Sequence, residues 1–193
     1  LGFNRSNFIS DNLKKLYELN LNNINISIDG PKNQNDSLEQ EKIKKIVSTK
    51  NYVKNYTQRK INYGIITSIP IAIDEFFKNS DKDLLIVEDD VILSKSALEF
   101  IATHKHRLKS ESDLFFISLN SPCDKFINSS YYSDFPYIWG WYISKKKWEE
   151  YRSFKKKFII LKILKKYFLH PLSFVYWSSV YLLVKLKILK SWD

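Results

Sequence analysis

The sequence is poor in the residues that build stapled, flexible or low-complexity proteins. It contains one cysteine, Cys123, so no disulfide can form within the chain and disulfide-stapled scaffolds are excluded. A single cysteine is also typical of a reducing compartment, which favours a cytoplasmic location. Four Gly and five Pro leave no room for a flexible linker or a low-complexity tract. The chain has no Met and begins with Leu1, so we expect a piece of a longer protein, cut at both ends.

What is present indicates one folded domain with an unusual distribution of charge. The chain has 193 residues, of which 44% are hydrophobic and 27% charged, values typical of a globular α/β or α+β domain. Residues 1–144 carry equal numbers of basic and acidic side chains, whereas residues 145–190 carry 13 Lys or Arg and only two Glu. Such a basic, aromatic block attracts nucleic acid, anionic lipid or acidic substrates without distinguishing among them.

The first 120 residues alternate strand and helix patterns, which predicts βαβ units and a largely parallel sheet. Helical spacing of apolar residues predicts a helix that begins at Ser6 or Ser10, and Asp36 with Glu39 resembles a capping box that starts a second helix. Further elements are predicted as strands over 24–28, 84–87 and 114–118, as helices over 69–77 and after Ser94, and as a loop over 120–135.

Three consecutive carboxylates, Glu88, Asp89 and Asp90, follow the predicted strand 84–87. Adjacent carboxylates repel one another unless a cation or ligand compensates their charge. Oxygen ligands suit Mg²⁺ or Mn²⁺, which share coordination between one or two carboxylates, water and substrate phosphates. Ligands of open α/β sheets also sit beyond the carboxyl ends of strands. The triplet is therefore a candidate cation site, although acidic residues are also common in turns that precede helices.

Other motifs are less specific by themselves. Asp29 and Gly30 end the strand over 24–28, which is first of all a turn signal, and Arg5 could pair with a phosphate or with a surface carboxylate. Trp139 and Trp141 flank Gly140, so flat apolar rings stand beside backbone that a ligand can approach closely. This arrangement fits a saccharide site, and it fits aromatic core packing equally well.

These motifs together form an ordered set over about residues 1–148. It consists of Phe3-Asn4-Arg5, Ile26-Ser27-Ile28-Asp29-Gly30-Pro31, Asn62-Tyr63-Gly64, Ile86-Val87-Glu88-Asp89-Asp90 and Trp139-Gly140-Trp141. The set resembles GT-A glycosyltransferases, and among them the bacterial hemolytic-protein-like nucleotide-diphospho-sugar transferases, which are related to animal inverting N-acetylglucosaminyltransferases. The resemblance implies a GT-A core over residues 1–150, a three-layer α/β/α arrangement with a mostly parallel mixed sheet. Residues 151–193 would then be a basic, aromatic, helical segment of the same domain, truncated at its C-terminus.

The resemblance also implies an activity, which is metal-dependent transfer of a sugar from a nucleotide-diphospho-sugar to a saccharide or lipid-linked acceptor in bacterial surface glycan synthesis. The expected transfer inverts the configuration of the anomeric carbon. Nucleic acid is not an expected partner. The implied roles are nucleotide binding for Arg5, Asp29, Asn62, Glu88 and Asp89, ligation of Mn²⁺ or Mg²⁺ by Asp90, contact with sugar and acceptor by Trp139, Gly140 and Trp141, and general base catalysis by Asp193.

The basic block leaves two other interpretations open. One is a non-catalytic domain that binds nucleic acid through phosphate contacts and aromatic stacking. The other is attachment to an anionic membrane surface, which would make the protein peripheral on the inner face of the membrane. The most hydrophobic window, residues 168–184, is interrupted by His170 and Pro171, which favours an interfacial or a core helix over a spanning one.

Overall fold

The computed structural model describes residues 5–120, 130–133 and 138–157. The chain divides into two compact units, residues 1–147 and 148–193. Helices and strands are mixed, as the sequence predicts for an α/β protein. In chain order they are α1 Ser6–Glu18, β1 Ile24–Ile28, α2 Gln34–Ser48, β2 Val53–Gln58, α3 Ile65–Lys78, β3 Leu84–Ile86, α4 Lys95–His104, α5 Arg107–Ser110, β4 Ile117–Ser118, β5 Trp141–Ile143 and α6 Lys145–Lys157.

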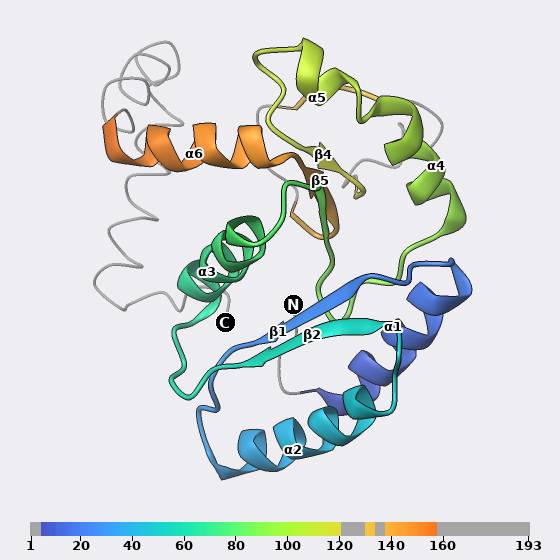
Figure 1. Ribbon diagram of the computed structural model, residues 1–193, viewed down its shortest axis with the longest axis vertical. Coiled ribbons are helices and arrows are strands. Elements are labelled where there is room, and N and C mark those ends of the chain that lie inside the picture. The colour runs from blue at the N-terminus through green and yellow to red at the C-terminus, as the bar shows by residue number, and fades with distance from the viewer. Residues whose placement is uncertain (1–4, 121–129, 134–137, 158–193) are drawn as a thin grey trace, which may run out of the picture. The chain divides into compact units, whose positions relative to one another are not determined.

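Strands β1 and β2 form a parallel pair, and helix α2 connects them. The isoleucines of β1 alternate with Asn25 and Ser27, so they share one face of the pair, where Ile26 and Ile28 are buried. Helices α1 and α2 cover this face (Figure 1). Their apolar residues complete a core cluster of Ile9, Leu13, Ile26, Ile28, Ile43 and Val47. The cluster fixes α1 against the first sheet.

A second sheet has the strand order β3-β5-β4, and both of its pairs are antiparallel. Trp141 of β5 lies opposite Ile86 of β3 on one side and opposite Ser118 of β4 on the other. Because neighbouring strands run in opposite directions, the segments that follow β3 and β4 and the segment that precedes β5 meet at the same edge of the sheet. This edge carries the candidate site.

The structure confirms several elements that the sequence predicts and corrects others. The strand over 24–28 and the helix that Ser94 caps are confirmed, the latter by a 3.2 Å hydrogen bond from the Ala97 amide to Ser94 Oγ. The prediction of a largely parallel sheet is wrong for the second sheet, and β3 and β4 are shorter than predicted. Strands β2 and β5 were not predicted, since neither shows a strong alternation of apolar residues.

Two helix starts differ from the predicted ones, for local reasons. The cap of α2 is Asn33, whose Oδ1 accepts from the Asp36 amide at 2.9 Å, while the Asp36 carboxylate accepts from the Lys32 amide. Helix α3 starts four residues earlier than predicted, so that Pro70 lies in its interior and not in its first turn. Its start is set by contacts of the preceding loop, described below.

No helix among the described residues is both long and apolar enough to cross a membrane. The hydrophobic window over 168–184 lies outside the part of the chain that the structure describes. Two lysines from the start of the basic block are bound within the first unit. Lys145 Nζ contacts Asp81 Oδ1 at 2.5 Å, and Lys147, which is buried, donates to the Ser112 carbonyl at 2.8 Å.

Candidate functional site

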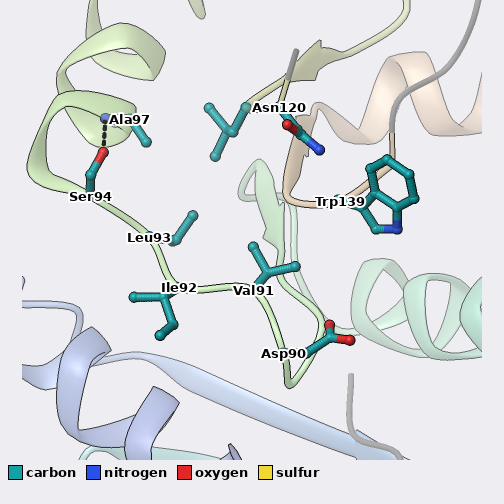
Figure 2. A pocket seen from close by; sticks show the side chains of 9 residues that line it. Asp90, Val91, Ile92, Leu93, Ser94, Ala97, Asn120 and Trp139 are labelled. Atoms are coloured by element: carbon teal, nitrogen blue, oxygen red, sulfur yellow. Dashed lines mark hydrogen bonds between the residues drawn. The ribbon is translucent and has the colours of Figure 1, made fainter. Parts of the chain in front are cut away.

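A pocket of about 410 Å³ lies at the edge of the second sheet. Three chain segments form it: the loop and helix start that follow β3, the two residues that follow β4, and Trp139 shortly before β5. Figure 2 shows the side chains of Asp90, Val91 and Trp139 among those that line it. The lining residues are Asp90, Val91, Ile92, Leu93, Ser94, Ala97, Leu119, Asn120 and Trp139. The pocket thus combines one carboxylate with an aromatic ring and aliphatic side chains.

The acidic triplet forms a tight turn at the end of β3, which we call the acidic turn, residues 88–91. The Val91 amide donates to the Glu88 carbonyl at 3.2 Å and closes it. The three carboxylates have different surroundings, because Glu88 and Asp89 are buried while the Asp90 side chain is 44% exposed. Burial raises the pKa of Glu88, and the charge of Asp90 raises it further. Asp90 is therefore the carboxylate of the triplet that a ligand in the pocket can reach.

Arg5 compensates much of the negative charge. Its guanidinium forms a two-pronged contact with Asp89, through Nε to Oδ2 at 3.0 Å and through Nη2 to Oδ1, and the Asp89 side chain is only 1% exposed. Arg5 Nη2 also lies 3.2 Å from Asp90 Oδ2. These contacts raise the pKa of Arg5, so the guanidinium stays charged. The structure thus brings Arg5, Asp89 and Asp90 together, and Arg5 contacts carboxylates of its own chain, whereas the resemblance implies contact with a nucleotide.

Asn12 holds the backbone of the acidic turn. It is buried on α1, and its Nδ2 donates to the carbonyls of Glu88 at 3.0 Å, Asp89 at 3.4 Å and Val91 at 2.9 Å. Asn12 was not among the predicted site residues. A signal for it exists, because Asn12 is a polar residue beside Leu13 on the apolar face of a helix, where a polar side chain needs a partner.

Asp29 has a role in the fold of its own loop. Its buried carboxylate accepts from the amides of Tyr63, at 3.0 and 3.1 Å, and Gly64, at 2.8 Å. This fixes the chain immediately before α3 and explains why the helix begins at Ile65. Asn62 contributes to the same loop, because its Nδ2 donates to the Gly30 carbonyl at 2.7 Å. Neither Asp29 nor Asn62 lines the pocket.

Gly30 allows two loops to touch. Its amide donates to the Ile61 carbonyl at 3.2 Å, and a Cβ built on Gly30 would lie 2.2 Å from the Ile61 carbonyl carbon. Only a residue without a side chain fits this close approach. The loops that follow β1 and β2 are therefore in close contact at Gly30.

The two tryptophans of the aromatic motif differ in their surroundings. Trp139 is 51% exposed and lines the pocket. Trp141 is 7% exposed, lies in the middle strand of the second sheet and packs edge-on against Phe116 with ring centroids 5.5 Å apart. Gly140 between them has φ 79°, a left-handed conformation that turns the chain from the pocket into β5. Core packing thus accounts for Trp141, and pocket lining for Trp139.

Asp90 could share the ligation of a divalent cation with a bound ligand. Among the described residues there is no group of three or more His, Cys, Asp or Glu side chains placed to enclose a metal ion. Asp90 offers carboxylate oxygens at the pocket, which suit Mg²⁺ or Mn²⁺, and these ions commonly take their remaining ligands from substrate phosphates and water. The residues present therefore fit a cation that arrives with a phosphate-bearing ligand.

Asp193, the expected general base, lies outside the described residues, as do residues 158–192 of the basic block. Comparisons with protein-family models, with curated proteins and with solved structures found no match to this chain. The resemblance to GT-A glycosyltransferases and the roles that it implies therefore stay predictions.

Proposed function

We propose that this pocket binds a nucleotide-diphospho-sugar together with Mn²⁺ or Mg²⁺, and that the protein transfers the sugar to a saccharide or lipid-linked acceptor. One observation carries the proposal: an exposed carboxylate, Asp90, and an exposed indole, Trp139, line the same pocket at the end of a strand. A sugar nucleotide presents both matching groups, a pyrophosphate that carries a cation and a sugar ring with an apolar face.

In this proposal each side chain has a distinct task. Asp90 holds the cation together with pyrophosphate oxygens, and Trp139 packs against the face of the sugar. Arg5 neutralises the buried Asp89, so that the acidic turn stays folded when the cation and its ligand bind or leave. The bound cation supplies charge neutralisation for the departing nucleoside diphosphate.

The apolar part of the pocket supports an organic ligand over a bare ion. Val91 and Leu119 lie close to Gly140, where a built Cβ would meet Val91 Cγ1 at 3.4 Å and Leu119 Cβ at 3.7 Å. The half-exposed Trp139 ring adds to this apolar lining. A site for a cation alone would need more oxygen ligands and no such wall.

The test is isothermal titration calorimetry of the protein with a panel of nucleotide sugars, each with and without Mn²⁺. We expect one donor to bind in a Mn²⁺-dependent manner, and Asp90→Asn to abolish that dependence. Asp113→Asn, a change of the same kind at an exposed carboxylate outside the pocket, is the matched control and should bind as the wild type does. The proposal fails if no nucleotide sugar binds, or if Asp90→Asn leaves Mn²⁺-dependent binding unchanged.

A further inference from the structure

Asn12 connects helix α1 to the backbone of the acidic turn over a separation of 76 to 79 residues. Its amide nitrogen lies within 3.4 Å of three carbonyl oxygens, and all three belong to the four residues that end in Val91. Three carbonyls that converge on one point repel one another unless a donor stands between them. The Asn12 amide therefore selects the conformation in which the turn points its carbonyls toward α1.

The other half of the Asn12 side chain shows what the residue is used for. Its Oδ1 is buried and has no hydrogen-bond partner among the described residues. An unpaired buried oxygen is unfavourable, and Leu, which has the same number and branching of side-chain heavy atoms, would suit the apolar neighbours Ile9 and Leu13. The hydrogen bonds that Nδ2 donates to the turn therefore offset the cost of burying the unpaired Oδ1. This indicates that Asn12 serves to hold the turn and not to fill the core.

Helix α1 is well anchored for this task. The residue at its start, Ser6, donates through its amide at 3.1 Å and through its hydroxyl at 2.6 Å to Glu39 Oε2 of α2. The core cluster fixes the next two turns of α1 against β1 and α2. Arg5, immediately before the helix, binds the side chains of the turn while Asn12 binds its backbone.

We infer that Asn12 is a positioning residue for the proposed cation site, because it fixes the turn from which Asp90 reaches the pocket. This inference rests on the proposed function for the identity of the ligand, but the contact with the turn does not. Groups that orient a metal ligand through hydrogen bonds commonly change metal affinity about 10- to 100-fold when they are removed. Asn12 touches neither the cation nor the substrate in this scheme.

The test compares the full chain with Asn12→Leu, which removes the amide donors and keeps the number and branching of the side-chain heavy atoms. Mn²⁺ bound to the protein is measured by equilibrium dialysis, with Mn²⁺ alone and with inorganic pyrophosphate added, because pyrophosphate itself binds Mn²⁺ in solution. Amide hydrogen exchange of Val91 is measured on the same samples. We expect Asn12→Leu to weaken Mn²⁺ binding about tenfold and to speed exchange at Val91 about tenfold or more.

Val47→Ala is the matched control, because it removes buried volume from the same core cluster without touching the acidic turn. It should lower the overall stability and leave both readouts at the wild-type values. If Asn12→Leu does not fold, Asn12→Ser replaces it, since the serine hydroxyl is too short to reach the three carbonyls and the same changes are expected.

The two hypotheses fail in different ways. If the wild type binds no Mn²⁺ in either condition, the cation site is refuted, and with it the role of Asn12 toward that site. If the wild type binds Mn²⁺ and Asn12→Leu binds it equally well with unchanged exchange at Val91, the positioning role is refuted while the proposed function stands. Equal changes in Asn12→Leu and Val47→Ala would likewise overturn the positioning role, because they would show a general loss of stability.

Discussion

Replacing Asp89 by Asn should mainly lower the stability of the protein, whereas replacing the neighbouring Asp90 by Asn should mainly abolish ligand binding. Asp89→Asn removes the charge from a side chain that is 1% exposed and holds Arg5 by two contacts. Loss of one partner from a fully buried pair costs about 3–5 kcal/mol. Because Arg5 is 39% exposed and can regain water, we expect Asp89→Asn to lower the free energy of unfolding by about 2 kcal/mol.

Asp90→Asn removes a charge of a different kind. The Asp90 side chain is 44% exposed, and it meets Arg5 through a single contact at 3.2 Å. Exposed pairs contribute about 0.2–1 kcal/mol, so we expect the free energy of unfolding to change by less than about 1 kcal/mol. Binding of the nucleotide sugar with Mn²⁺ should be lost in this variant, whereas the effect of Asp89→Asn on stability is expected with or without a ligand.

Urea unfolding followed by tryptophan fluorescence gives both free energies, and calorimetry with Mn²⁺ and the nucleotide sugar gives the binding. Equal losses of stability in the two variants would refute the reasoning, because burial would then not separate the two residues. A stable Asp89→Asn protein would show that the Arg5 pair contributes nothing to the fold.

Three further outcomes follow from contacts described above. Trp141→Ala should lower the free energy of unfolding by about 3–5 kcal/mol in thermal or urea unfolding, because its ring is buried. Trp139→Ala should leave that free energy nearly unchanged and weaken binding of the nucleotide sugar several-fold in calorimetry, and similar stabilities for the two variants would contradict this. Gly30→Ala should destabilise the protein by about 2–3 kcal/mol, since its Cβ would collide with the backbone at Ile61; wild-type stability in urea would rule out that close approach. Hydrogen bonds from Lys42 and from Ser6 lower the pKa of Glu39 to about 2, so the stability that its charge contributes should be fully present above pH 4.5 and lost as the pH falls toward 2. If the unfolding free energy of Glu39→Gln parallels that of the wild type over this pH range, the carboxylate makes no such contribution.

Sequence patterns predicted the elements whose signals are local. The alternating isoleucines of β1 and the cap at Ser94 depend on residues within a few positions of one another, and both predictions are confirmed. The position of the acidic turn at the end of a strand is confirmed for the same reason, because the apolar run up to Ile86 and the carboxylates after it adjoin in the sequence.

The interactions that fix the site have no local signal. Arg5 and Asp89 are 84 residues apart, and nothing near either residue indicates that they pair. Strand β5 has three residues, too few for a period-2 pattern, and becomes a strand because it fits between β3 and β4. Pro70 favoured a helix that starts at Ile69, but the hydrogen bonds from the Tyr63 and Gly64 amides to Asp29 let the helix begin earlier, at Ile65. A tertiary contact thus outweighs the local preference.

The contacts of Arg5 and Asn12 with the acidic turn also have a consequence for the order of folding. They close a loop of about 80 residues, and the entropy of loop closure grows only with the logarithm of loop length, so the distance adds little to the thermodynamic cost. Long-range contacts nevertheless form slowly, because the intervening chain must first be brought into place. We therefore expect the turn to acquire its final shape late in folding, after β1, α2 and β2 have assembled against α1.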